Sequence, residues 1–199
     1  MAEAGVLAAD ASGRDMWIEA GLKEIGRSGV DGVRVEVLAE SLGITKGGFY
    51  RRFKDRRALL GAMLETWQRG RIAAIEKQTV LGDEDPRERL RSLIRLYSER
   101  VNPEGIAIEL AIRQWARSDA VAVAAVESVD DTRLSRVTRL YQAIGLSAEE
   151  ARARAVLVYS FIFGQSLLFL GEAPRKRASL IAACADVLTD VNLDRDFMR

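Results

Sequence analysis

Residues 45–57 read TKGGFYRRFKDRR, and this stretch decides how the N-terminal part of the chain is interpreted. It concentrates positive charge in a protein of 199 residues whose net charge is only +1. Phe49 and Phe53 are four residues apart, so on a helix both rings point to one side, and the opposite side carries glycine, basic and aromatic residues. Gly47 and Gly48 are adjacent, although a glycine inside a helix costs roughly 1 kcal/mol relative to alanine. The stretch therefore predicts a helix with one buried face and an outer face that a partner can approach closely.

The residues before this stretch complete a helix-turn-helix. Apolar residues at steps of three and four predict helices over about 14–28 and 35–42, and Gly43 can adopt the positive φ that ends the second of them. A third helix over 46–53 follows at once, with Thr45 expected to accept an N-cap hydrogen bond from its first turn. Two short helices joined by a tight turn, the second basic on its outer face, are typical of a DNA-binding helix-turn-helix.

The outer side of the third helix is expected to enter the major groove of double-stranded DNA. Missing side chains at Gly47 and Gly48 would let the backbone approach phosphates and thymine methyl groups. Lys46 and Arg56 are expected to neutralise phosphates, which leaves Arg51 to read a base edge. The alternative is a solvated basic face on an ordinary core helix, but such a face gains nothing from two glycines or an exposed tyrosine.

The rest of the chain is predicted to be helical as well. A fourth helix, capped by Asp55, is expected to reach about residue 78, and Ser147 and Glu150 have the spacing of a capping box. No alternating strand pattern competes, so we expect an all-α fold of about nine helices. After the fourth, these cover about 86–101, 104–117, 119–144, 147–170 and 174–191.

Composition excludes several classes of protein. The chain has no histidine and a single cysteine, Cys184, which leaves no disulfide framework, no usual zinc ligand set and no Ser-His-Asp or Cys-His catalysis, and no cofactor is expected. Residues 1–13 carry acids and no long apolar run, so we expect a flexible tail of a cytoplasmic protein rather than a targeting peptide. The apolar run 155–170 is shorter than the roughly 20 residues that cross a bilayer, which predicts a buried helix and no membrane partner.

Residues 29–60, GVDGVRVEVLAESLGITKGGFYRRFKDRRALL, resemble the N-terminal signature of the TetR family of bacterial transcriptional regulators. The matching positions are Leu38-Ala39, Gly43-Ile44-Thr45, Lys46-Gly47, Phe49-Tyr50, Phe53-Lys54 and Leu59-Leu60. The resemblance implies DNA contacts at Thr45, Lys46, Gly47, Tyr50, Arg51, Arg52 and Arg56, and the same DNA-facing set includes Arg34, Gly48 and Lys54. The family often caps its second helix with Ser or Thr, where this chain has Val33, Arg34 and Val35. Either Arg34 replaces a phosphate contact with a charge, or the second helix starts less well capped.

The resemblance also implies an effector-binding and dimerising C-terminal domain. We expect a DNA-binding domain over 14–60 and an effector-binding and dimerisation domain over 61–199, linked by the helix that starts near residue 55. Candidate pocket residues are Trp67, Tyr97, Ile112, Arg113, Trp115, Tyr141, Phe161 and Gln165. Candidate dimer contacts are Leu157, Phe161, Gly164, Leu168, Leu180, Ile181, Cys184 and Leu188. For each of these the alternative is a place in the core of one subunit.

These expectations lead to one hypothesis and two alternatives. The hypothesis is a ligand-responsive regulator, usually a repressor, that binds a palindromic operator as a homodimer and is released by a small-molecule effector. One alternative is an all-helical enzyme with an acidic site, built on Glu109 or on Asp130 and Asp131, although adjacent residues point apart on a helix. The other is an architectural DNA-binding protein, which near-neutral net charge disfavours.

Overall fold

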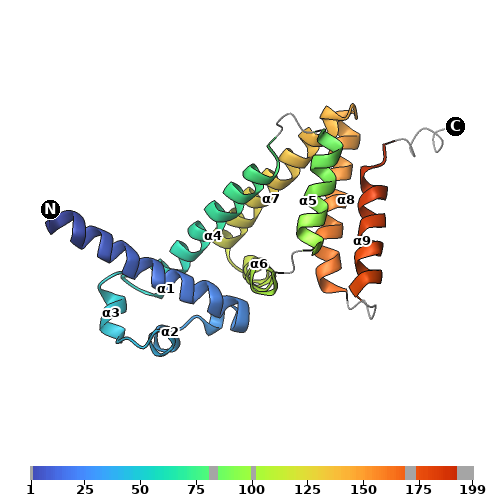
Figure 1. Ribbon diagram of the computed structural model, residues 1–199. Coiled ribbons are helices and arrows are strands. Elements are labelled where there is room, and N and C mark those ends of the chain that lie inside the picture. The colour runs from blue at the N-terminus through green and yellow to red at the C-terminus, as the bar shows by residue number, and fades with distance from the viewer. Residues whose placement is uncertain (1, 81–84, 100–101, 169–173, 192–199) are drawn as a thin grey trace. The chain divides into compact units, whose positions relative to one another are not determined.

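The computed structural model describes residues 2–80, 85–99, 102–168 and 174–191, and these ranges fold into helices with no strand among them (Figure 1). The all-α expectation is confirmed. The helices of these ranges are α1 (Ala2–Gly32), α2 (Val35–Leu42), α3 (Lys46–Tyr50), α4 (Arg56–Gln78), α5 (Pro86–Glu99), α6 (Pro103–Ala116), α7 (Ala120–Ala143), α8 (Ala148–Leu167) and α9 (Pro174–Thr189).

The chain divides into two compact units. The first comprises Met1–Arg71 with Asn102–Val129, and the second Ile72–Val101 with Asp130–Arg199, so α4 and α7 contribute residues to both. The first unit therefore contains α6, which the sequence assigned to the C-terminal domain. The functional division into DNA-binding and effector-binding parts stays a prediction.

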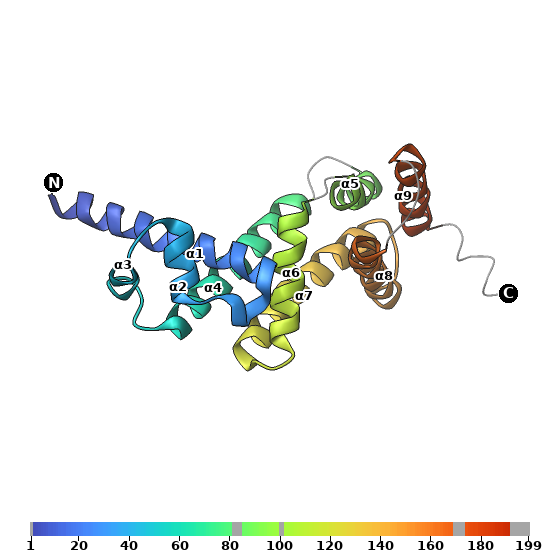
Figure 2. The same ribbon diagram turned by 90° about the horizontal axis from the view of Figure 1, so that it is seen from below.

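The core of the first unit is built around the aromatic residues of α3. Phe49 is fully buried, packs edge-on against Trp17 of α1 at 5.2 Å between ring centroids, and stacks on Phe53 at 5.4 Å. α1 also lies alongside α6 (Figure 2). A Cβ atom at Gly26 would stand 3.2 Å from Ile108 Cγ1, so a small residue at this point lets α1 and α6 approach closely.

The ends of α2 and α4 follow the predicted signals. Gly43 has φ 66° and its N–H donates to carbonyls of the last turn of α2, as expected of a glycine cap. Asp55 Oδ1 accepts a hydrogen bond from Ala58 N at 2.8 Å and so caps the first turn of α4. These local signals place both boundaries correctly.

Local features of α1 and α3 differ from the prediction. α1 begins at Ala2 rather than near residue 14, so most of the expected tail is helical, consistent with the alanine-rich composition of residues 2–11. α3 ends at Tyr50 rather than Phe53, because the N–H groups of Arg52 and Phe53 both donate to the Phe49 carbonyl and tighten the last turn. Thr45 is the N-cap of α3, yet its side chain makes no cap hydrogen bond, and Gly48 N donates to the Thr45 carbonyl instead.

The second unit packs α5, α8 and α9 around a buried apolar cluster. Tyr141 of α7 is buried in it, and its hydroxyl donates to the Leu188 carbonyl of α9 at 2.6 Å. Burial raises the pKa of Tyr141 to about 12. The predicted capping box at the start of α8 is present, and the hydrogen bond from the Ser147 hydroxyl lowers the pKa of Glu150.

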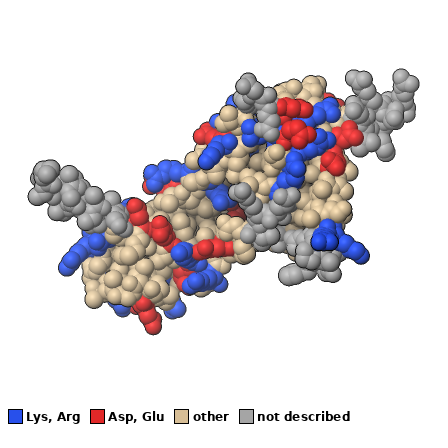
Figure 3. Space-filling model, viewed as in Figure 1, with Lys and Arg blue, Asp and Glu red and all other residues tan. Residues whose placement is uncertain are grey.

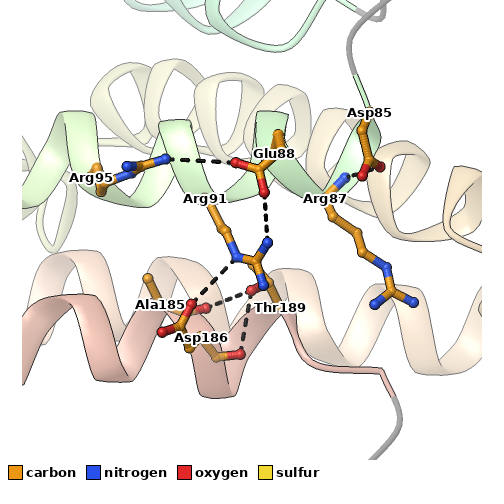
Figure 4. Close-up of polar contacts among 8 residues, drawn as sticks. All are labelled: Asp85, Arg87, Glu88, Arg91, Arg95, Ala185, Asp186 and Thr189. Atoms are coloured by element: carbon orange, nitrogen blue, oxygen red, sulfur yellow. Dashed lines mark hydrogen bonds and ion pairs between the residues drawn. The ribbon is translucent and has the colours of Figure 1, made fainter.

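Arg91 of α5 pairs with an acid of its own helix and with one of α9 on the surface of this unit (Figure 4). Arg91 Nη1 lies 2.6 Å from Glu88 Oε1, and its Nε lies 3.4 Å from Asp186 Oδ1. The Glu88 hydrogen bond raises the pKa of Arg91 above its ordinary value. In the described part of the chain, no helix is long and apolar enough to cross a membrane.

Candidate nucleic-acid interface

The outer side of α3 presents the residue types expected of a DNA-contacting helix. Tyr50 is 62% exposed, whereas Phe49, next to it in the chain, is fully buried. Gly47 and Arg51 are also exposed, and Arg51 forms the C-cap of the helix. The helix therefore separates into a buried aromatic side and an outer side of glycine, tyrosine and arginine, as predicted.

The glycine pair has no steric reason within the described chain. A Cβ atom at Gly48 would meet nothing within 4 Å, and at Gly47 it would meet only Thr45 Oγ1, at 3.7 Å. Neither residue has the positive φ that favours glycine. Alanine would thus fit both sites and favour the helix, so the absence of side chains matters only for what approaches from outside.

Lys46, the first residue of α3, pairs with a residue that sequence reasoning missed. Its Nζ lies 2.8 Å from Glu36 Oε1 of α2, and more than half of each side chain remains exposed. The Lys46 hydrogen bond lowers the pKa of Glu36. A phosphate contact by Lys46 would compete with this pair. No spacing rule predicts the pair, because its partners lie on different helices.

Two arginines of the expected DNA-facing set bind the protein's own backbone. Arg52 is half-buried and donates from Nη1 to the Gly48 carbonyl at 3.0 Å. Arg56 donates from Nε to the Val33 carbonyl at 2.6 Å and from Nη2 to the Val30 carbonyl. The guanidinium of Arg56 thus ties the start of α4 to the connection between α1 and α2, and a phosphate contact would have to compete with these bonds.

The remaining members of the set are exposed. Arg34 is the N-cap of α2 and makes no side-chain cap hydrogen bond, as expected because a guanidinium has no acceptor. The second helix thus starts without a side-chain cap, and whether Arg34 also contacts a phosphate stays a prediction. Thr45 and Lys54 are exposed as well.

The predicted pocket residues are divided between the two units, and their role in a pocket stays a prediction. Trp67, Ile112, Arg113 and Trp115 belong to the first unit, and Tyr141, Phe161 and Gln165 belong to the second. The side chain of Tyr97 lies outside those that the structure describes. Tyr141 anchors α9, and Phe161 packs against the same apolar cluster. Trp115 is a lining residue of a cavity in the first unit.

The predicted dimer contacts on α8 and α9 are partly exposed. Leu157, Leu168 and Leu180 are 57%, 59% and 42% exposed. Gly164 and Cys184 are partly exposed, Phe161 and Leu188 pack partly against the core, and Ile181 is buried within the subunit. Val156, Leu167 and Val187 are also exposed but were not among the predicted contacts. Leu167 and Val187 each lie three residues after a predicted contact, at Gly164 and Cys184, and Val156 is adjacent to Leu157.

Two of the three acids considered for an enzyme, Glu109 and Asp130, are engaged in ion pairs. Glu109 Oε1 lies 3.0 Å from Arg113 Nη2, and Asp130 Oδ1 lies 3.1 Å from Arg133 Nη1. Among the described residues, no group of three or more histidine, cysteine, aspartate or glutamate side chains is arranged to hold a metal ion. Positive and negative side chains are interspersed over the visible face in Figure 3, unlike the broad basic surface of an architectural DNA-binding protein.

Comparison with known proteins agrees with this geometry. Residues 18–63 match the family model for bacterial regulatory proteins of the tetR family. The HTH-type transcriptional regulator BetI of Pseudomonas aeruginosa is 26% identical over 144 residues, which cover 71% of this chain and 73% of the relative.

Solved structures share the fold. A transcriptional regulator from Rhodococcus sp. aligns with a TM-score of 0.70 at 17% identity, covering 88% of this chain and 93% of its own. A regulator from Saccharomonospora viridis, solved in complex with choline, aligns with a TM-score of 0.68 at 17% identity, covering 92% of this chain and 97% of its own.

Proposed function

The chain belongs to the TetR family of bacterial transcriptional regulators, and we propose that it binds a palindromic operator as a homodimer and releases it when a small molecule binds. The observation that carries the proposal is the outer side of α3, where two glycines without a steric role in the fold lie beside exposed Tyr50 and Arg51. Such a surface lets a helix approach the floor of the major groove.

The DNA-contacting residues divide by role. Lys46, Arg34 and Lys54 are exposed cations that supply affinity through phosphates without sequence information. Arg51 is the base-reading candidate, because an arginine can bind both acceptors of a guanine. Arg52, which bonds a carbonyl of α3, and Arg56, which ties the start of α4 to Val33, are assigned to holding the fold rather than to contacting DNA.

Dimerisation is proposed through α8 and α9. Their exposed apolar side chains include Leu157 and Leu180, and exposed Leu168 directly follows α8. In this family the two helices form a four-helix bundle with those of a second subunit. A two-fold dimer presents two copies of α3, and half-sites roughly 34–36 Å apart would then place both in the major groove.

Release by an effector is proposed to act on the spacing of the two recognition helices. A molecule that binds one spacing more tightly shifts the population toward it, and a spacing other than one helical turn weakens DNA binding. The choline complex of the Saccharomonospora relative supports a small-molecule response in general, and at this identity it does not transfer the ligand.

The testing experiment is selection of the purified full chain against a random double-stranded DNA library at about 150 mM salt. An enriched inverted repeat, with half-sites about one helical turn apart, is the expected result. A folded and dimeric protein that enriches no motif would contradict sequence-specific binding. An enriched single half-site, bound by a monomer, would contradict the dimeric operator alone.

A further inference from the structure

The first unit contains a cavity of about 480 Å³ beside the start of α4. Its walls come from the end of α1, the first turns of α4, the end of α6 and the start of α7. This volume lies within the range of about 300–1,000 Å³ that small-molecule sites occupy. The cavity is separate from the outer side of α3.

One wall of the cavity is apolar. Leu60 and Leu64 of α4 and Trp115 of α6 are nearly buried lining residues, and Val121 of α7 is an exposed one. An indole beside two leucines offers a surface for an aromatic ring or a short aliphatic chain.

The charges around the cavity favour an anion. Asp119 Oδ1 accepts hydrogen bonds from the N–H groups of Val121 at 2.9 Å and Ala122 at 3.0 Å, so its charge is directed to the N-terminus of α7. Arg56 is bound only to neutral backbone carbonyls in the contacts given above, and therefore keeps its full positive charge.

The other two charged lining residues have no partner in the described part of the chain. Neither Arg57 of α4 nor Asp31 of α1 forms a hydrogen bond or an ion pair there, and both side chains are exposed. Because the Asp119 carboxylate already binds the N-terminus of α7, the lining keeps two guanidinium groups, those of Arg56 and Arg57, and one available carboxylate, that of Asp31. A negatively charged group is thus better compensated in this cavity than a positive one.

We propose that the cavity binds a small apolar molecule that carries one carboxylate. The carboxylate pairs with the Arg57 guanidinium, whose fork geometry matches it, and the apolar part lies against Leu60, Leu64 and Trp115. Because Arg56 lines the same cavity and holds the connection between α1 and α2, the ligand binds beside the link that positions the helix-turn-helix.

Three probes with the same apolar body test the charge preference. Isothermal titration calorimetry on the full chain compares 4-phenylbutyrate, 4-phenylbutan-1-ol and 4-phenylbutylamine, without DNA. The expected result is saturable binding of the carboxylate, binding of the alcohol weaker by about tenfold, and no measurable binding of the amine. Failure of the carboxylate to bind, or equal binding of the amine, would overturn the proposal.

Two glycines of α4 supply matched variants that test the location. Gly61 is a lining residue and Gly70 is not, and at both a Cβ atom would meet nothing within 4 Å. Gly61→Leu should place a side chain in the cavity and weaken binding of 4-phenylbutyrate without lowering the melting temperature, whereas Gly70→Leu should bind like the wild type. Arg57→Gln should reduce the affinity for the carboxylate to that for the alcohol. Undiminished binding by Gly61→Leu would place the probe elsewhere and overturn the proposal. These readouts contain no DNA, so they are independent of operator binding.

Discussion

Gly47→Ala tests the DNA-facing role of α3 sharply, because fold stability and DNA affinity are expected to change in opposite directions. In the free protein the added methyl group has Thr45 Oγ1 as its nearest neighbour, at an ordinary contact distance of 3.7 Å, and Gly47 does not have a positive φ. Replacing a helical glycine by alanine should therefore stabilise the fold by about 0.5–1 kcal/mol. For a chain of this size, that corresponds to a rise of about 1–4 °C in the melting temperature.

On DNA the same methyl group should be harmful. It would project from the outer side of α3, where the proposed interface needs close approach, and overpacking of a close contact costs about 1–3 kcal/mol. Operator affinity should thus fall by about fivefold to 150-fold. The assay is fluorescence anisotropy on the selected duplex, alongside thermal unfolding.

Gly70→Ala is the matched control, since its Cβ would also meet nothing within 4 Å and it lies on α4. It should raise the melting temperature and leave DNA affinity unchanged. If Gly47→Ala raised the melting temperature and kept the wild-type affinity, the glycine pair would have no role in approach to DNA. The basic side of α3 would then be a solvated face only.

Other substitutions test single contacts. Glu36→Gln should release Lys46 from its ion pair and so tighten operator binding. The slope of log K against log salt concentration should steepen by up to about 0.9, and an unchanged slope would mean that Lys46 contacts no phosphate. Arg51→Ala should cost about 1–3 kcal/mol at the operator and relax preference at one base pair, whereas an equal loss on random DNA would make Arg51 a phosphate contact. Leu157→Glu should convert the dimer to a monomer in sedimentation equilibrium, and a persistent dimer would place the interface elsewhere. Tyr141→Phe should lower the free energy of unfolding by about 1 kcal/mol at neutral pH. The pKa of Tyr141 is about 12 in the folded protein and 10.0 ordinarily, so the unfolded chain loses this proton first as the pH rises. Between pH 10 and 12 the wild type should therefore lose up to about 2–3 kcal/mol of its free energy of unfolding, and Tyr141→Phe should not show this loss; denaturant titration measures both.

Local signals in the sequence predicted most of the helix boundaries. The cap hydrogen bonds of α2, α4 and α8 involve Gly43, Asp55 and the Ser147–Glu150 pair, each within one turn of its own helix. Such bonds depend on nearby residues only, so they can be predicted without knowledge of the surrounding fold. The buried and outer sides of α3 were predictable for the same reason, since both follow from the spacing of Phe49 and Phe53.

Contacts between distant residues were not predictable in this way. The Lys46–Glu36 pair crosses from α3 to α2, and Arg56 reaches carbonyls 23 and 26 residues earlier in the chain. Likewise, the packing of α6 against α1 depends on a close approach at Gly26 that no periodicity indicates. Charge and spacing identified the basic residues near the proposed DNA-facing side of α3. They did not show which of those residues bind other parts of the protein.

The kind of basic residue helps to separate these uses. Arg56 donates to two carbonyls at once from a planar guanidinium, whose five donors have a fixed geometry, whereas the three donors of a lysine ammonium rotate freely. Lys46 at the first turn of α3 instead makes one exposed pair with Glu36, an arrangement that a phosphate can replace at little cost. The dense charge of residues 45–57 thus divides by use. Arg52 bonds a carbonyl of α3 itself and Arg56 ties the start of α4 to Val30 and Val33, whereas the exposed cations are the ones proposed to draw the protein to DNA. Counting every basic residue of the stretch as a phosphate contact would therefore overestimate the salt dependence of DNA binding.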